Sequence, residues 1–285
     1  MKKLCFAFLL SSIGFAQTNT EVYLFELSNT HETWKVGTGK NISNNEGYDS
    51  QPSFYNKENL LFSSTRNGQT DIANYHIKTG KLTFLNNTPN GGEYSPQRIP
   101  KSKNVSAVRL DTDGLQRFYS YNITTGKSNE LIKDLKVAYP MWYDKNTILC
   151  VTIIGKGLDL IVHDRRTKSN TSIQKKVGRS LHAIPNSNLI SYISKENTTW
   201  EVKSLHPKTG EIKKIINTIE QCEDICWLPD GTLLAANKNV IFKYNPTTDK
   251  IWTIFHRFPK EKFKNISRIL VDKKGTKLAL VSEGT

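Results

Sequence analysis

Acidic, basic, amide and aromatic side chains that could bind a polar ligand lie in five short segments spread along the chain. They are Asp49, Gln51, Glu93, Tyr94, Arg179, His182, Glu223, Asp224 and Arg268. Carboxylates, guanidinium groups and phenol rings that converge on a concavity could hold a charged or hydrogen-bonding ligand, and a histidine or tyrosine could act as base or acid. Arg109 is a further candidate, because an isolated arginine in an apolar run is expected to reach a carboxylate or a polar cavity.

These candidates carry no recognisable catalytic or metal-binding motif. Residues 37–40 lack the spacing of a phosphate-binding loop. Residues 178–182 lack the last glycine of a nucleophile elbow, and residues 111–114 fit an Asp-Gly hairpin turn better than a calcium loop. The six histidines are scattered and have no metal-ligand spacing. The sequence therefore predicts no cofactor, no metal and no assignable catalytic residue.

The first 16 residues predict export. Two lysines, an apolar run and small residues ending at Ala16 have the form of a secretory signal peptide. The apolar run is shorter than the ~20 residues that span a bilayer, so no stable membrane insertion is expected after cleavage. The predicted location is the periplasm, or outside the cell.

Charge and cysteine content limit the expected partners and cross-links. The formal net charge is +14, yet the lysines are spread over the whole chain, so no nucleic-acid partner is predicted. An envelope protein or a small or anionic ligand fits better, with the protein itself a monomer. Three cysteines remain beyond the signal peptide, and an odd count excludes a fully paired framework. We expect buried thiols, with a disulfide or metal role as the alternative.

The candidates are positioned by a repeat. A turn pattern seen in full at CWLPDGTLLAA recurs with markers at Phe54, Arg98, Trp142, Ile184, Trp227 and Leu270, which are spaced by 44, 44, 42, 43 and 43 residues. A second marker, a turn such as KTG or TTG before the last strand, keeps step with the first. Four short strands per repeat of ~40–45 residues are typical of a β-propeller.

The sequence thus predicts an all-β, six-bladed β-propeller of four-stranded antiparallel blades. Residues 1–16 are the signal peptide and residues 17–285 a single propeller domain. Residues 266–283 supply only two strands of a repeat and residues 21–43 only the other two, so their pairing is expected to close the ring. The predicted blades are 47–87, 91–133, 137–177, 179–219, 222–261, and 266–283 together with 21–43.

This architecture turns the polar segments into one predicted site. The innermost strand of each blade lines the central channel, and the candidate residues lie in or just before those strands. Because buried charge is costly unless it is paired or hydrated, we expect these side chains to line a water-filled channel mouth. A channel that is polar only because it is hydrated is the alternative.

The stretches SSTRNGQTDIANYHIKTG and CWLPDGTLLAA resemble the repeat of bacterial TolB-like β-propellers, and the similarity runs over nearly all of the chain beyond residue 16. This resemblance implies a periplasmic six-bladed propeller that binds proteins or ligands without established chemistry. TolB itself has an additional N-terminal α/β domain, which is missing here because the strands begin at about Glu21.

The leading functional hypothesis is an exported, non-catalytic binding protein or interaction scaffold that holds its partner at the channel mouth. The alternative is a stand-alone propeller enzyme, a lyase or hydrolase that acts on an acidic saccharide. In that scheme His182 or Tyr94 is base or acid and Arg179 offsets the substrate charge.

Overall fold

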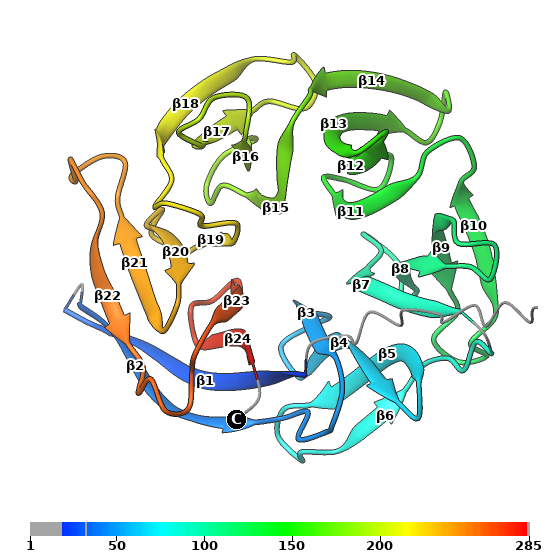
Figure 1. Cartoon of the computed structure of the whole chain (residues 1–285), viewed down its shortest axis with the longest axis horizontal. Coiled ribbons are helices and arrows are strands. Elements are labelled where there is room, and N and C mark those ends of the chain that lie inside the picture. The colour runs from blue at the N-terminus through cyan, green and yellow to red at the C-terminus, as the bar shows by residue number, and fades with distance from the viewer. Residues whose placement is uncertain (1–18, 32, 90, 284–285) are drawn as a thin grey trace, which may run out of the picture.

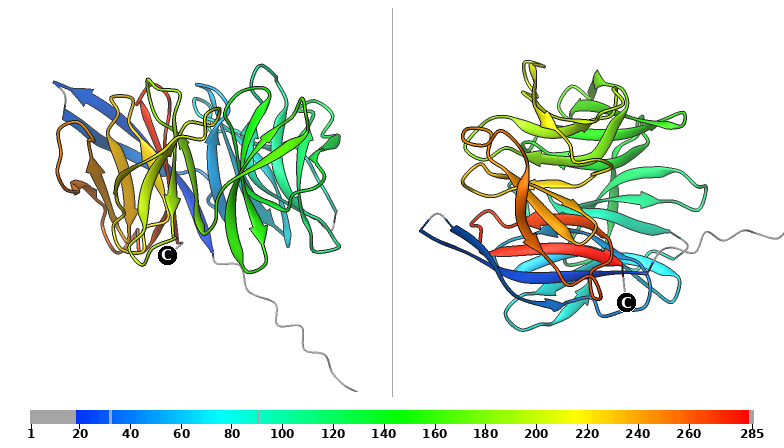
Figure 2. Two further views of the ribbon diagram at one scale, coloured as in Figure 1. Left: turned by 90° about the horizontal axis from the view of Figure 1, so that it is seen from above. Right: turned by 60° about the vertical axis from the view of Figure 1, so that its left-hand side comes forward.

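The structure is a computed structural model that describes residues 19–31, 33–89 and 91–283. The predicted signal peptide lies outside these residues. The described chain forms a ring of β-sheets around a central axis (Figure 1). Seen from the side, the strands run across the thickness of the ring (Figure 2). Within the described part, no helix has the length and apolar character needed to cross a membrane.

Within each sheet, most strands pair antiparallel with the strand next to them in sequence. The strands are β1 (Thr20–Thr30), β2 (Thr33–Asn41), β3 (Asp49–Phe54), β4 (Asn59–Arg66), β5 (Gln69–His76), β6 (Leu82–Phe84), β7 (Gly92–Arg98), β8 (Val105–Leu110), β9 (Gln116–Tyr121), β10 (Ser128–Ile132), β11 (Val137–Trp142), β12 (Thr147–Ile154), β13 (Gly157–Asp164), β14 (Ser169–Gln174), β15 (Val177–Ala183), β16 (Ile190–Ser194), β17 (Glu201–Leu205), β18 (Ile212–Asn217), β19 (Ile225–Trp227), β20 (Leu233–Asn237), β21 (Val240–Tyr244), β22 (Thr253–Arg257), β23 (Ile266–Val271) and β24 (Lys277–Glu283).

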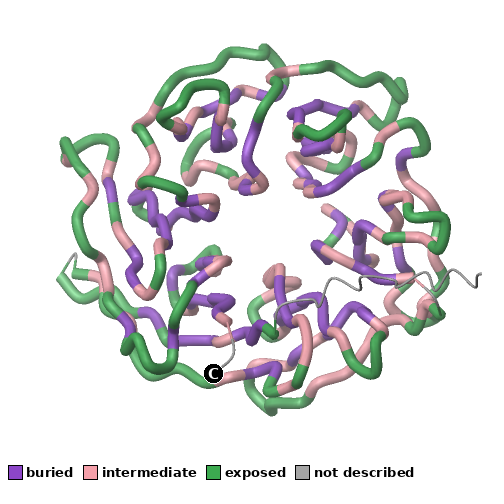
Figure 3. The backbone as a smooth tube through the Cα atoms, viewed as in Figure 1, coloured by how far each residue is buried: buried purple, intermediate pink, exposed green. Residues whose placement is uncertain are grey.

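Some strands are buried along most of their length. β4 and β12 each have five consecutive buried residues, because neighbouring sheets cover both of their faces. The outer strands β14 and β18 are mostly exposed. Burial is therefore concentrated on the inner and middle strands (Figure 3).

The hydrophobic clusters lie between neighbouring sheets. Leu149 and Leu160, from β12 and β13, pack against Ile190 and Tyr192 of the next sheet. The cysteines belong to such clusters: Cys150, Cys222 and Cys226 are buried and free, which confirms the prediction of buried thiols.

The predicted count of six separate four-stranded blades is wrong. Four sheets are four-stranded, β11–β14, β15–β18, β19–β22 and β2-β1-β24-β23, whereas β3 to β10 form one eight-stranded sheet. The link is a parallel bridge between Thr70 of β5 and Gly92 of β7. Gly91 and Gly92 have no side chains to hold the two strands apart, and Gln69 Nε2 donates to the carbonyl oxygen of Gly91 at 2.9 Å. The ring therefore has four separate blades and one continuous double-width sheet.

The pairing of the two ends of the chain is confirmed. β1 pairs antiparallel with β24 from Thr20↔Glu283 to Glu26↔Lys277. The sheet order β2-β1-β24-β23 means that the first two and last two strands share one sheet. Neither segment would have a complete sheet without the other, so this pairing closes the ring.

Candidate functional site

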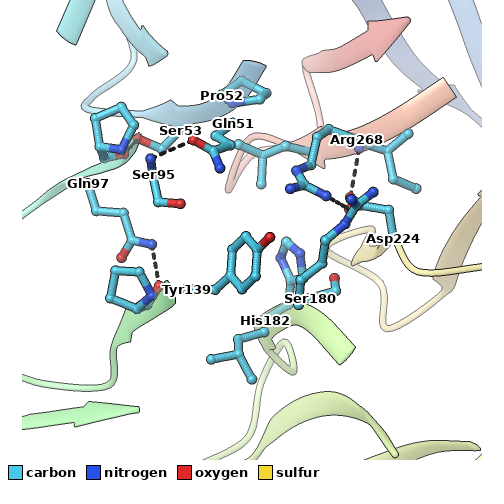
Figure 4. A pocket seen from close by; sticks show the side chains of 16 residues that line it. Gln51, Pro52, Ser53, Ser95, Gln97, Tyr139, Ser180, His182, Asp224 and Arg268 are labelled. Atoms are coloured by element: carbon cyan, nitrogen blue, oxygen red, sulfur yellow. Dashed lines mark hydrogen bonds and ion pairs between the residues drawn. The ribbon is translucent and has the colours of Figure 1, made fainter. Parts of the chain in front are cut away.

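A cavity of about 110 Å³ lies on the ring axis, lined by the innermost strands. Its side chains come from β3, β7, β11, β15 and β23 and from the segment that leads into β19. Figure 4 shows side chains of these strands converging, with Tyr139, His182, Asp224 and Arg268 close together. Segments far apart in sequence thus supply one site, as the propeller prediction requires.

Irregular backbone aims these side chains. The pairing of each of five inner strands with its neighbour shifts register once, between Ser50 and Ser53 in β3 and at corresponding places in β7, β11, β15 and β23. Such bulges turn a strand locally and redirect a side chain. Gln51 and Ser95 also have positive φ angles, 58° and 52°, which are uncommon for residues other than glycine. Each precedes a proline, so the pocket contains strained backbone at equivalent points of two strands.

Hydrogen bonds tie one inner strand to the next on one side of the cavity. Gln51 Oε1 accepts from the backbone N–H of Ser95 at 2.7 Å, and Gln97 Nε2 donates to the carbonyl oxygen of Pro140 at 2.6 Å (Figure 4). Ser180 Oγ of β15 donates to the carbonyl oxygen of Ile225 at 3.1 Å, which links β15 to β19, the inner strand of the neighbouring sheet. The Oε1 of Gln51, which also accepts from Ser63 Oγ at 3.1 Å, therefore links β3 to β7 and is already occupied.

The other side of the cavity is a charge cluster around Asp224. Its Oδ2 accepts from Arg268 Nη1 at 2.9 Å, and its Oδ1 accepts from the backbone N–H of Ile269 at 3.1 Å. Arg179 Nη2 donates to the carbonyl oxygen of Ser267 at 2.7 Å, and Arg179 Nε lies 3.5 Å from Asp224 Oδ2. These contacts hold two guanidinium groups beside one carboxylate.

Glu223 and Lys195 extend the cluster. Glu223 Oε2 is 3.6 Å from Arg179 Nε, and its Oε1 forms an ion pair with Lys195 Nζ. The Lys195 ammonium also lies over the ring of Trp200, 4.0 Å from its centroid. Glu223 is therefore shared between two cations.

Burial sets the protonation state of the pocket. It lowers the pKa of His182, with a further lowering from the Arg268 charge and an opposing effect from Asp224, so the imidazole is neutral at pH 7. Burial also lowers the pKa of Arg179, and the neighbouring Arg268 charge adds to the effect. For Arg268 burial acts in the same direction, but attraction to Asp224, Tyr139 and Tyr48 outweighs it and raises the pKa.

The structure brings together half of the predicted site residues. Gln51, Arg179, His182, Asp224 and Arg268 line the cavity. Two more are next to lining residues: Glu223 forms an ion pair with Arg179, and Tyr94 directly precedes Ser95, with its ring edge-on against Tyr48 at a centroid distance of 6.1 Å.

The other three predicted residues do not line the cavity either. Asp49 and Glu93 have no exposed surface; Asn45 Nδ2 donates to Asp49 Oδ2 at 3.2 Å, and the Tyr121 hydroxyl donates to Glu93 Oε1 at 2.9 Å.

Arg109 is the third of these residues. Its Nε pairs with Asp111 Oδ1 at 2.5 Å, and its guanidinium stacks on the Tyr119 ring at 3.7 Å. A carboxylate two residues along the chain captures this arginine, so it does not reach the cavity.

The sequence prediction missed Ser95, Gln97, Tyr139 and Lys195. A signal for Ser95 and Tyr139 was present, because a polar residue or tyrosine precedes proline in Gln51-Pro52, Ser95-Pro96 and Tyr139-Pro140, and all six of these residues line the cavity. Lys195 directly follows β16, just as Arg66 and Arg109 lie at the ends of their strands. No group of three or more His, Cys, Asp or Glu side chains that could hold a metal occurs in the described residues.

Comparison with known proteins identifies structures with a similar fold but does not assign the chain to a family. No family model matches the chain, and no curated protein sequence matches it. A structure described as "putative TolB from Agrobacterium tumefaciens" has a TM-score of 0.72 and 10% identity over 94% of this chain and 99% of that one. TolB from Acinetobacter baumannii gives 0.56 and 12% over 93% of this chain and 64% of that one.

A gluconolactonase from Xanthomonas campestris has a TM-score of 0.63 and 8% identity, over 93% of this chain and 96% of that one. At such identities the likeness shows a shared β-propeller fold, which hosts both binding proteins and enzymes. The expected likeness to TolB-like propellers is thus confirmed for the fold.

Proposed function

We propose that this protein is an exported, non-catalytic binding protein that holds a segment of a protein partner, or a small ligand, at its central channel. The observation that carries the proposal is the convergence of Arg179, Arg268, His182, Asp224 and Tyr139 on one cavity. Charged and aromatic groups that meet in a concavity are the usual basis of recognition. The first 16 residues and the fold shared with two TolB structures support export and an envelope protein as the partner.

Cavity size favours a binding role over turnover of a saccharide. The cavity measures about 110 Å³, whereas pockets for small-molecule ligands commonly hold ~300–1,000 Å³. A side chain or a chain end fits this space better than a sugar ring with its neighbours. Most polar groups of the cavity are also engaged with each other, as expected for a rigid recognition surface.

Crosslinking in cells followed by mass spectrometry tests the proposal. The wild-type chain is compared with Arg179→Gln and with Arg166→Gln, which changes an exposed arginine of the turn after β13. We expect a crosslinked partner to be lost with Arg179→Gln and kept with Arg166→Gln. Identical partners for all three proteins would reject the channel as the binding site.

An enzyme acting on an acidic saccharide is a second candidate, favoured by one observation. His182, which burial keeps neutral at pH 7, lines the cavity with Arg179 and could act as a base. Turnover of oligogalacturonate or a uronic acid lactone that is abolished by His182→Ala would replace the binding proposal.

A further inference from the structure

The charges around the cavity do not cancel. Arg179, Arg268 and Lys195 are linked by ion pairs to only two carboxylates, those of Glu223 and Asp224. The neutral His182 adds no charge. The cluster therefore carries one positive charge in excess, in a place where burial makes an uncompensated charge costly.

The excess charge is best assigned to Arg179. Both oxygens of Asp224 are taken, one by Arg268 and one by the backbone N–H of Ile269, and Glu223 forms a close pair with Lys195. The hydrogen bond recorded for Arg179 goes instead to a neutral acceptor, the carbonyl oxygen of Ser267. Its Nε is buried and has no hydrogen-bond partner among the described residues. A guanidinium group with five donors is thus held in place with most of its capacity unused.

The surroundings fix this arginine rather than let it move to solvent. Its side chain is 25% exposed, and Ser267 holds Nη2 from across the channel, since Arg179 lies on β15 and Ser267 on β23. Arg268 is held beside it by Asp224, and its guanidinium lies over the Tyr139 ring, 5.7 Å from the centroid. A binding group fixed before its ligand arrives loses little conformational entropy on binding.

We propose that Arg179 and Arg268 form a subsite for a single carboxylate of a bound peptide, supplied by an acidic side chain or by a chain end. This inference rests on the proposed binding function and names the group that is recognised. One carboxylate neutralises the one excess charge, whereas a dianion would leave a negative charge uncompensated. The planar guanidinium matches a carboxylate in a two-pronged geometry, which gives orientation as well as attraction.

Titration of the full-length chain with three blocked tripeptides, followed by backbone amide chemical shifts, tests the subsite. The first is glycine–aspartate–glycine with both ends capped, and the second replaces aspartate by asparagine. The third is acetylated triglycine with a free carboxyl end. We expect binding of one or both acidic probes and at least tenfold weaker binding of the neutral one, as expected for loss of a charged hydrogen bond. The stronger of the two acidic probes identifies the source of the carboxylate.

Variants separate charge from geometry. Arg179→Gln is expected to weaken the acidic probes about tenfold or more, Arg179→Lys to recover part of the loss, and Arg166→Gln to change nothing. Circular dichroism and thermal melting establish that each variant is folded. Equal binding of the aspartate and asparagine peptides, an equal loss with Arg166→Gln, or tighter binding of inorganic phosphate would overturn the proposal. A crosslinked partner that still depends on Arg179 would then leave the binding function intact.

Discussion

Asp49 offers a direct test of the electrostatics, because its carboxylate is buried without a full set of partners. The residue has no exposed surface, and its Oδ1 has no hydrogen-bond partner among the described residues. Burial, with a smaller contribution from the Glu21 charge, raises its pKa from 3.8 to about 6, against the opposing effects of Ser64, Asn45 and Arg66. Replacing Asp49 by asparagine keeps the shape and removes the charge.

The sign and size of the effect follow from proton linkage. Between pH 3.8 and 6 the folded chain binds more protons at Asp49 than the unfolded chain, so this contribution to stability is full below pH 3.8 and is lost as pH rises through 6. At pH 7.5 the charged form destabilises the fold by about 3 kcal/mol, because each pKa unit is worth about 1.4 kcal/mol. We therefore expect Asp49→Asn to raise the free energy of unfolding by up to about 3 kcal/mol at pH 7.5 and by less than about 1 kcal/mol at pH 4.

Urea unfolding of wild type and variant at both pH values measures the effect, and a gain of this size corresponds to roughly 6–12 °C in melting temperature. Asp113→Asn is the control, because Asp113 is half exposed and its pKa is lowered to about 2 by hydrogen bonds from Arg117. That variant should gain no stability at pH 7.5. The reasoning is refuted if Asp49→Asn is less stable than wild type at pH 7.5, or if its gain is the same at both pH values.

Three further predictions concern the ring itself. Deleting residues 266–285 removes β23 and β24 from the closing sheet and leaves β1 paired with β2 alone, so the product should aggregate or unfold; a soluble monomer with the wild-type melting temperature would contradict the closure. Asp111→Ala should lower the free energy of unfolding in urea by about 2–3 kcal/mol, because it removes the charged hydrogen bonds from Arg109 and Arg117. A loss below ~0.5 kcal/mol would show that these ion pairs contribute little to stability. Trp227→Phe should lower the free energy of unfolding by about 1–3 kcal/mol, because it removes the 2.8 Å hydrogen bond to the buried Ser191 hydroxyl. Adding Ser191→Ala to the same chain should recover part of this loss of stability, and no recovery would mean that the loss comes from packing.

Much of the fold was predictable because the same turn residues recur at equivalent places in successive repeats. Gly80, Gly126 and Gly210 end equivalent turns with positive φ angles, which is why KTG and TTG served as reliable markers. The error in the number of separate blades arose from one contact. The parallel bridge between Thr70 and Gly92 joins two successive repeats, and the period of the sequence contains no information about contacts between repeats.

The candidate site was predicted only in part, because side chains do not alternate regularly between the two faces of the inner strands at their bulges. In a regular strand Asp49 and Gln51 would share a face, as would Glu93 and Ser95. The register shifts in β3 and β7 separate these pairs, so the first member is covered by neighbouring strands and the second lines the cavity. A sequence pattern reveals the polar residues of an inner strand, but the bulge decides which of them reaches the channel.

The proposed carboxylate subsite shares a strand with the sheet that closes the ring. Arg268 and Ser267 lie on β23, which belongs to the sheet formed by both ends of the chain, and Asp224 and Arg179 hold β23 from the neighbouring inner segments. A ligand on Arg179 and Arg268 would therefore contact β23 of the closing sheet and β15 of a different sheet. Because anything that binds only the folded state stabilises it, occupancy of the channel would stabilise the closed ring.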